Sequence, residues 1–366
     1  MSAPPLEIAF FGSSLISAWW NGAATYYRGL IRALANRGHA ITFYEPDAYD
    51  RRDHRDIDDP DWAKSVIFQA QTESDVDAAL RCARNADLIV KCSGVGVWDE
   101  YLEAGVLRIR KPSARVAFLD VDAPATLDRV HSNPRDPFLE LIPLYDFIFT
   151  YGGGDPVVNA YRELGARECV PIYNALDPET HHPVAPDPRF HCDLGFLGNR
   201  LPDREARVEE FFLRPATLCN ASFLLGGNGW QDKPLPANVR WAGHVYTADH
   251  NAFNCSAKSV LNIARDSMAR YGFSPATRVF EAAGAGACII TDAWTGIELF
   301  LQPGEEILVA ENGADVARLL TELSAERART IGHAAKKRIL ASHTYAHRAA
   351  LLEDVLSQAR TAGAAR

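Results

Sequence analysis

Arg278 and Glu281, three positions apart, are the most informative pair of side chains in this sequence. They lie in a run of small residues that predicts a short helix, which follows a loop and precedes a buried strand at 288–292. The amino end of a helix offers unpaired N–H groups and a positive dipole end to an anion. Arg278 adds a forked donor for phosphate oxygens, and Glu281 adds a bidentate acceptor for the two hydroxyls of a ribose. The segment therefore predicts a nucleoside diphosphate site, although an isolated pair at this spacing is more simply a surface ion pair.

Three other polar positions follow predicted strands. The turn after residues 194–197 contains Gly198, Asn199 and Arg200, so backbone N–H groups and an arginine can meet a pyrophosphate there. Arg265 follows the apolar run 259–263, which favours a place at the same cleft, unless it only pairs with the adjacent aspartate. His244 follows another strand and faces either a base or a sugar, unless it is a structural hydrogen bonder.

The stretch SPATRVFEAAGAGACIITDAWTGIELFLQPGEEILVA resembles the donor-binding region of two-domain GT-B glycosyltransferases. It is most similar to the group of the spore-maturation protein CgeB and its bacterial relatives. Many retaining GT-B enzymes carry two glutamates here, seven residues apart, and the second holds the donor ribose. Glu281 matches the second glutamate, and Phe273 stands where the first would be. Because the first glutamate is missing, the sequence does not predict how the donor sugar is bound, nor whether the reaction is retaining or inverting.

The resemblance also implies roles for basic residues near the donor phosphates. Related GT-B enzymes use basic residues at the turn after the first strand of the second domain to neutralise the departing diphosphate. On that basis Arg200 and Arg204 are expected to bind the donor phosphates. For Arg204 an ion pair with Asp203 or Glu205 on a solvated helix start remains an equal alternative. The donor-binding residues expected in this domain are Gly198, Asn199, Arg200, Arg204, Arg265, Arg278 and Glu281.

The first half of the chain contains an Asp-Val-Asp sequence, Asp120 to Asp122, directly after a strand at 116–119. In one-domain glycosyltransferases such a pattern chelates a divalent metal on the diphosphate. Here it lies far from the donor segment, where arginines already provide the positive charge, so a metal-free donor site is expected. Asp122 is instead the candidate catalytic base for an acceptor hydroxyl. The alternative is a turn or helix-capping role, since Asp-Ala-Pro is common in loops.

The loop after the first strand is expected to border the same cleft. It runs from Gly12 to Gly22, and in GT-B enzymes the equivalent loop touches the donor sugar or the diphosphate. The candidate cleft-lining residues are Ser13, Asn21, Gly22 and, from the second half, His244.

Strands alternate with helical patterns in both halves, which predicts an α/β fold of two Rossmann-like domains facing across a cleft, as in GT-B enzymes. The N-terminal acceptor domain is expected at 1–175, a proline-rich linker at 176–192 and the nucleotide-sugar donor domain at 193–342. Residues 343–366 predict a C-terminal helix that packs back on the first domain. Its apolar positions are Tyr345, Ala349, Leu352, Val355 and Leu356.

Composition agrees with a soluble cytoplasmic protein. The 366 residues are 47% hydrophobic and 23% charged, and the formal net charge is −9, which argues against broad attraction to nucleic acid or anionic membranes. The seven cysteines show no paired spacing, so they are expected to be reduced. No basic leader and no apolar run near the ~18 residues of a membrane span are present in the sequence, so stable membrane insertion is not expected.

The expected activity is metal-independent transfer of a sugar from a nucleotide diphosphate-sugar to a glycan, small-molecule or protein acceptor. The donor is a co-substrate, and no other cofactor is expected. The base, sugar, acceptor and oligomeric state stay open. The alternatives are a nucleotide-sugar epimerase of the same fold and a non-catalytic protein that binds nucleotide-sugars or glycans. An NAD-dependent oxidoreductase is disfavoured because neither half has GxGxxG after its first strand.

Overall fold

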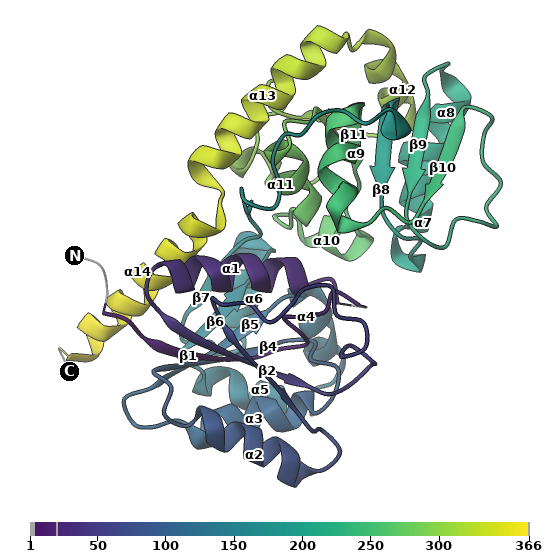
Figure 1. Ribbon diagram of the computed structural model, residues 1–366. Helices are drawn as coiled ribbons and strands as arrows, with labels where there is room; N and C mark the ends of the chain where they lie inside the picture. The colour runs from purple at the N-terminus through teal and green to yellow at the C-terminus, as the bar shows by residue number, and fades with distance from the viewer. Residues whose placement is uncertain (1–3, 20, 365–366) are drawn as a thin grey trace. The chain divides into compact units, whose positions relative to one another are not determined.

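The chain folds into two compact α/β units (Figure 1). The structure is a computed structural model that describes residues 4–19 and 21–364. The first unit comprises Met1–Tyr173 together with Tyr345–Arg366, and the second comprises Asn174–Thr344. Each unit contains one parallel sheet flanked by helices, so the predicted α/β class is confirmed.

The first unit is built on a seven-stranded sheet with the order β3-β2-β1-β4-β5-β6-β7, in which all neighbours are parallel. The strands are Glu7–Phe11 (β1), Ala40–Pro46 (β2), Lys64–Phe68 (β3), Leu88–Cys92 (β4), Arg115–Asp120 (β5), Phe147–Thr150 (β6) and Cys169–Pro171 (β7). The edge strands β3 and β7 lack a clear sequence signal because β3 is only partly buried and β7 has three residues. The strand order reverses between β1 and β4, the position at which sheets of this type bind ligands.

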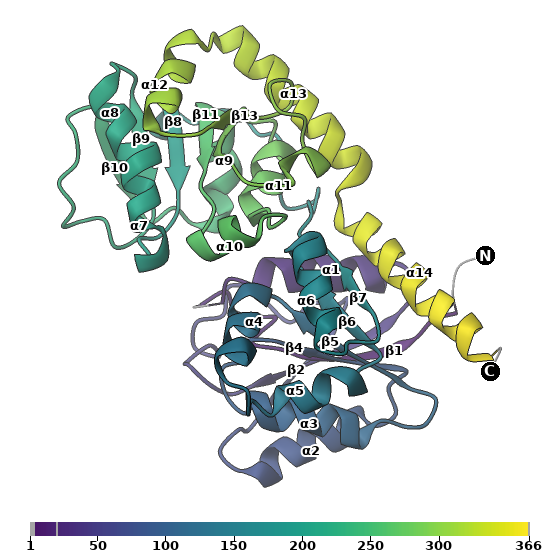
Figure 2. The same ribbon diagram turned by 180° about the vertical axis from the view of Figure 1, so that it is seen from behind.

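Helices cover both faces of the first sheet. In both views α2 and α3 lie on one face, and α1 and the C-terminal helix α14 lie on the other (Figures 1 and 2). Because both faces are covered, the central strands are buried throughout, as in Leu88–Cys92. The helices are Ala24–Asn36 (α1), Glu73–Ala83 (α2), Asp99–Ile109 (α3), Ala123–Ser132 (α4), Phe138–Leu141 (α5), the short 3-10 turn Ile142–Leu144 (η1) and Gly154–Glu163 (α6).

The C-terminal helix α14 (Tyr345–Ala364) belongs to the first unit and packs along α1, as expected. Gly29 of α1 makes this contact possible, because a Cβ there would lie 2.1 Å from the Tyr345 ring. Further along, the Glu353 carboxylate is 2.5 Å from Arg37 and 3.0 Å from His39. All five predicted apolar positions of this helix are buried. The helix begins at Tyr345 rather than at 343, because His343 caps the preceding helix and Thr344 forms a β-bridge with Leu176.

The second unit has a six-stranded parallel sheet with the order β10-β9-β8-β11-β12-β13. The strands are Cys192–Leu197 (β8), Phe223–Gly226 (β9), Val239–Gly243 (β10), Ala257–Asn262 (β11), Ile289–Asp292 (β12) and Leu308–Ala310 (β13). Successive residues of β9 face opposite sides: Phe223 and Leu225 join one core cluster, whereas Leu224 packs with Phe253 in another. Here the order reverses between β8 and β11.

Several short helices surround this second sheet. Residues 202–218 form two helices, Pro202–Val208 (α7) and Arg214–Leu218 (α8), joined by a π-helical segment, Glu209–Leu213 (η3). The other elements are Pro188–Phe190 (η2), Thr247–Asp249 (η4), His250–Ser256 (α9), Asp266–Tyr271 (α10), Thr277–Gly284 (α11), Ile297–Leu299 (η5), Gly313–Glu322 (α12) and Ala325–Ser342 (α13). Among the residues that the structure describes, no helix is both long and apolar enough to cross a membrane.

Candidate donor site of the second unit

The ends of β8 and β11 bring the predicted donor residues of the second unit together. These strands are neighbours in the sheet, and β12 follows β11. Parallel strands end at the same edge, so the loops after β8 and β11 and the start of α11 converge there. These segments carry Arg204, Arg265 and Arg278.

Arg204 and Arg278 lie over the ring of Phe196, the penultimate residue of β8. Their guanidinium carbons are 5.7 Å and 5.2 Å from the ring centroid, a cation–π distance. Arg278 donates to the carbonyl oxygen of Leu197, and Arg204 donates to that of Asn199 at 2.6 Å. Packing and backbone contacts therefore fix both guanidinium groups at the turn that follows β8.

The charges of this cluster are only partly balanced. Burial, together with the nearby Arg204, lowers the pKa of Arg278 to about 10, although the Glu281 charge acts in the opposite direction. Burial also lowers the pKa of Arg204, and Arg265 acts in the same direction. Arg265 pairs with Asp203 at 2.6 Å. Within the described residues the buried Nε of Arg204 has no hydrogen-bond partner. The cluster thus has donors and positive charge to spare for an anion.

Glu281 lies on α11, close to one turn after Arg278. Its side chain is 19% exposed, and Oε1 is 4.0 Å from Nε2 of the buried His181. His250, at the start of α9, is close enough for the Glu281 charge to raise its pKa, but burial lowers that pKa by more. The carboxylate is therefore partly open, with an arginine and two imidazoles near it.

Gly198 and Asn199 form a turn that is held by internal hydrogen bonds. Gly198 donates its N–H to Gly226 at 2.9 Å and accepts from the indole of Trp230 at 2.8 Å. The Asn199 side chain accepts from the backbone N–H of Asn228 at 2.9 Å. Trp230 is 1% exposed, so it closes this turn rather than offering a face to a base.

Arg200 differs from the other arginines in that acidic side chains already engage it. It is 2.7 Å from Glu205 and 3.1 Å from Asp232. Hydrogen bonds from Arg200 and Lys233 lower the pKa of Glu205 to about 2. Among the described residues at this turn, Arg200 thus forms two ion pairs, whereas Arg204 forms none and feels the charge of Asp203 only from a longer distance.

His244 lies at the end of β10, two strands from β8 in the sheet. It is exposed, its Nδ1 is 3.3 Å from the Asn228 amide, and its ring meets that of Tyr246 edge-on at 4.6 Å. It therefore lies at the same sheet edge as the arginines, and its ring contacts Asn228 and Tyr246.

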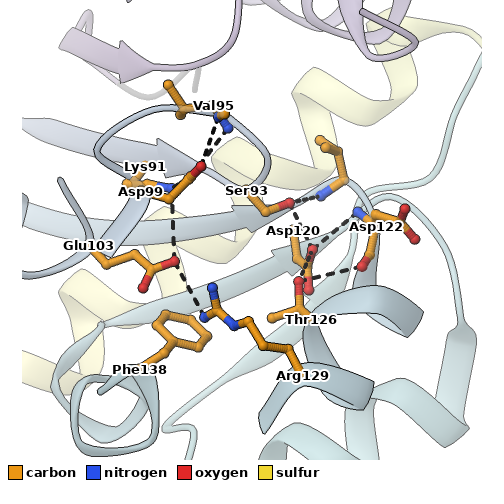
Figure 3. Close-up of polar contacts among 12 residues, drawn as sticks. Lys91, Ser93, Val95, Asp99, Glu103, Asp120, Asp122, Thr126, Arg129 and Phe138 are labelled. Atoms are coloured by element: carbon orange, nitrogen blue, oxygen red, sulfur yellow. Dashed lines mark hydrogen bonds and ion pairs between the residues drawn. The ribbon is translucent and has the colours of Figure 1, made fainter. Parts of the chain in front are cut away.

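In the first unit Asp120, the last residue of β5, is fully buried and accepts hydrogen bonds from several neighbouring segments (Figure 3). Its carboxylate accepts from the Tyr161 hydroxyl at 2.5 Å, from Ser93 at 2.8 Å, from Thr126 at 3.0 Å and from the Asp122 N–H at 3.1 Å. Burial raises its pKa despite these bonds. With its oxygens so engaged, Asp120 is poorly suited to binding a metal ion, and the described residues contain no cluster of three or more metal-ligating side chains.

Asp122 stands at the N-cap position of α4, beside Asp120 (Figure 3). Its carbonyl accepts the first helical hydrogen bond, from the Thr126 N–H at 3.1 Å. Among the described residues its carboxylate accepts no capping hydrogen bond, which argues against the capping alternative. The hydrogen bond to Asp120 fixes the backbone from which this carboxylate projects.

The loop after β1 is held by its own polar side chains. The Ser13 hydroxyl donates to the Asn21 side chain at 2.9 Å, and the Asn21 amide donates to the carbonyls of Ser14 and Ser17 at 2.8 and 3.0 Å. Ser13 and Asn21 are buried, whereas a Cβ at Gly22 would meet no atom within 4 Å. Ser13 and Asn21 therefore shape the loop, and Gly22 is its open position.

A row of charged side chains, of which Lys91 and Glu103 are buried, supports the loop after β4 in the first unit (Figure 3). Lys91 of β4 has no exposed side-chain surface and pairs with Asp99, and its Nζ is 3.9 Å from Glu103. Glu103 is in turn 3.5 Å from Arg129. Asp99 accepts from the N–H groups of Val95 and Gly96, which fixes the loop after β4.

Three residues near the arginine cluster could not be identified from the sequence: Phe196, His181 and His250. Phe196 looks like an ordinary strand residue, and the sequence carries no sign that two arginines stack on it. His181 falls in the segment predicted as a linker, and His250 lies 31 residues before Glu281. Only the folded chain brings them together.

A family model described as "Glycosyl transferase-like" matches residues 204–354. A search of the curated proteins gave no significant match.

Solved structures resemble the chain along almost its whole length. Sucrose-phosphate synthase from Thermosynechococcus elongatus has a TM-score of 0.69 at 14% identity, over 97% of this chain and 99% of that one. HepE from Anabaena, solved with UDP-glucose, has a TM-score of 0.65 at 13% identity, over 96% and 100%. The T4 phage enzyme BGT, also solved with UDP-glucose, has 0.58 at 12%, over 96% and 99%. At these identities the likeness establishes the fold, which is that of the GT-B glycosyltransferases.

Proposed function

We propose that this chain, a glycosyltransferase of GT-B fold, takes its sugar from a nucleoside diphosphate-sugar bound by the second unit. The observation that carries the proposal is the pair Arg204 and Arg278 on the ring of Phe196. Two guanidinium groups on one ring, with the buried Nε of Arg204 lacking a hydrogen-bond partner among the described residues, form a site that an anion of two charges completes. A pyrophosphate matches that charge, and the two guanidinium groups offer it forked donors.

The other proposed contacts to the donor are made by residues at the same edge of the second sheet. Glu281, close to one helical turn from Arg278, is proposed to accept hydrogen bonds from both ribose hydroxyls. Arg265 adds positive charge from the neighbouring loop. Because HepE and BGT were solved with UDP-glucose, uridine nucleotides are the first donors to test.

In the proposed reaction an acceptor group, such as a hydroxyl, attacks the anomeric carbon of the donor sugar. The bond from that carbon to the phosphate oxygen breaks, and the nucleoside diphosphate leaves with the bonding pair. Arg204 and Arg278 stabilise the charge that develops on this leaving group. Asp122 of the first unit is proposed to take the acceptor proton.

Metal independence is part of the proposal. Its support is that the arginines supply positive charge at the phosphates, whereas the oxygens of Asp120 are committed to neighbouring donors. We further propose kinship with the CgeB-like group, on the sequence around Glu281. The acceptor is proposed to be a glycan, a small molecule or a protein rather than a nucleic acid.

The experiment that tests the function measures free nucleotide released from UDP-, GDP- and dTDP-sugars, with and without a panel of candidate acceptors. The proposal expects release that depends on the acceptor, together with a new glycoside in the product. Isomerisation of the donor without transfer would instead identify an epimerase. Binding without any turnover across the panel would identify a nucleotide-sugar-binding protein.

A further inference from the structure

The segment 177–182, which composition marks as part of a linker, forms an ordered turn in the second unit. The Asp177 carbonyl accepts the N–H groups of Thr180 at 3.2 Å and His181 at 3.0 Å. The Asp177 side chain accepts the N–H of Glu179 at 3.0 Å. The Thr180 hydroxyl lies 3.0 Å from Nδ1 of His181. The His181 imidazole is therefore oriented by a hydroxyl of its own turn.

Two helices of the donor site hold this turn in place. On α11 a Cβ at Gly284 would lie 3.0 Å from the His181 carbonyl oxygen, so the backbones touch. Gly284 is three residues after Glu281, on the same side of the helix. On α9 the Asn251 amide donates to the Thr180 carbonyl at 2.9 Å. The turn, α9 and α11 therefore converge on Glu281.

The result is a buried imidazole facing the carboxylate. Nε2 of His181 is 4.0 Å from Oε1 of Glu281, and the side chains are 7% and 19% exposed. Two other ionisable groups act on this pair, His250 from α9 and Arg278 from α11. The turn itself adds the acids Asp177 and Glu179.

We propose that His181 is a positioning residue for Glu281 and makes binding of the nucleotide-sugar sensitive to pH. The proposal rests on the function assigned above, in which Glu281 accepts both ribose hydroxyls. That contact needs both carboxylate oxygens. A neutral imidazole leaves them to the ribose, whereas an imidazolium competes for Oε1. Imidazoles ordinarily change charge between pH 5 and 8, so donor affinity falls as the solution becomes acidic.

His250 does not reproduce this behaviour. Burial lowers its pKa, and its Nε2 is 3.3 Å from the Val245 carbonyl oxygen, a contact that a ring N–H satisfies. Arg278 keeps its charge throughout this pH range. Nε2 of His181, by contrast, faces Oε1 of Glu281 at 4.0 Å.

Calorimetry with the intact chain tests the proposal. UDP-glucose, GDP-mannose and dTDP-glucose are first titrated at pH 7.5, and the tightest binder is then titrated at pH 7.5 and 5.5. A nucleotide-sugar is the right probe because its pyrophosphate, unlike that of a free diphosphate, does not gain a proton in this range. Wild type is expected to lose up to about ten-fold in affinity over these two pH units.

His181→Gln is expected to bind with the same affinity at both pH values, within about two-fold. The matched control is His182→Gln, which alters the exposed neighbouring histidine and keeps the pH dependence. If His181→Gln does not fold, Glu281→Gln provides the second test, because it removes the carboxylate and is expected to abolish the pH dependence while weakening binding.

An unchanged pH dependence in His181→Gln, or a wild type without any, overturns the role of His181 and leaves the proposed function standing. If none of the three nucleotide-sugars binds wild type at pH 7.5, the proposed function fails, and the inference fails with it.

Discussion

Arg204 and Arg278 share one aromatic platform, the ring of Phe196, at 5.7 and 5.2 Å from its centroid. Burial and mutual repulsion hold the pKa of Arg278 down to about 10. Packing on this ring keeps the two like charges close to each other. An anion that binds there relieves the repulsion and meets donors that need no rearrangement.

Arg204→Gln is expected to weaken the binding of nucleoside diphosphates about ten-fold or more. Each hydrogen bond to a charged group contributes about 1.5–3 kcal/mol, and 1.4 kcal/mol corresponds to ten-fold. Binding of the nucleoside without phosphates is expected to stay within about two-fold, because Arg204 is assigned to the phosphates alone. Calorimetric titration with UDP and with uridine separates these contributions.

Arg200→Gln is the matched control for Arg204→Gln. Arg200 lies on the same turn, but Glu205 and Asp232 already neutralise it. Its replacement is therefore expected to cost less affinity for the diphosphate. A larger loss in Arg200→Gln than in Arg204→Gln would reverse the assignment of the two residues.

Glu281→Ala is expected to weaken binding of any nucleoside diphosphate while the fold is retained. The loss of a charge-assisted pair of hydrogen bonds to the ribose corresponds to about 1.5–3 kcal/mol. The 2′,3′-dideoxy nucleotide lacks the partner groups, so its affinity is expected to be the same for wild type and variant. Equal affinity of both proteins for the normal ribonucleotide would remove Glu281 from the donor site.

Activity is expected to survive a strong chelator. The physical reason is that arginines supply the charge, whereas the Asp120 carboxylate accepts from Ser93, Thr126 and Tyr161. Turnover is measured after treatment with EDTA and again after addition of Mg²⁺ or Mn²⁺. Loss of turnover that either ion restores would contradict the metal-free site.

Lys91→Met is expected to destabilise the first unit by about 3–5 kcal/mol, because it removes the cation that pairs with Asp99 and one of the cations near the buried Glu103. Chemical denaturation measures the change. Lys111→Met is the control, since Lys111 and Asp87 are each about a third exposed and their pair contributes at most about 1 kcal/mol. Equal effects of the two substitutions would mean that burial does not strengthen the Lys91 contacts.

The sequence predicted best those features that depend on neighbours along the chain. Arg278 and Glu281 stand three apart on one helix, so a short window contains both. The apolar spacing from Tyr345 to Leu356 likewise predicted the buried face of α14. The five positions predicted to form this face are all buried. In both cases local periodicity carries the information.

Contacts between distant segments could not be predicted in this way. Arg200 forms an ion pair with Asp232, which lies 32 residues further along the chain. The sequence around Arg200 does not predict this pair. The same holds for the burial of Asp120, which depends on Ser93 and Tyr161 from other elements. Charge and spacing identify candidate site residues, but only the tertiary contacts show which of them already have hydrogen-bond or ion-pair partners within the protein.

The most direct test of the donor site is a crystal structure with bound UDP, or with whichever of UDP, GDP and dTDP binds most tightly. The account predicts diphosphate oxygens within hydrogen-bonding distance of Arg204 and Arg278, and both ribose hydroxyls at the Glu281 carboxylate. A nucleotide held elsewhere, such as on Asp120 and Asp122 through a metal ion, would contradict it.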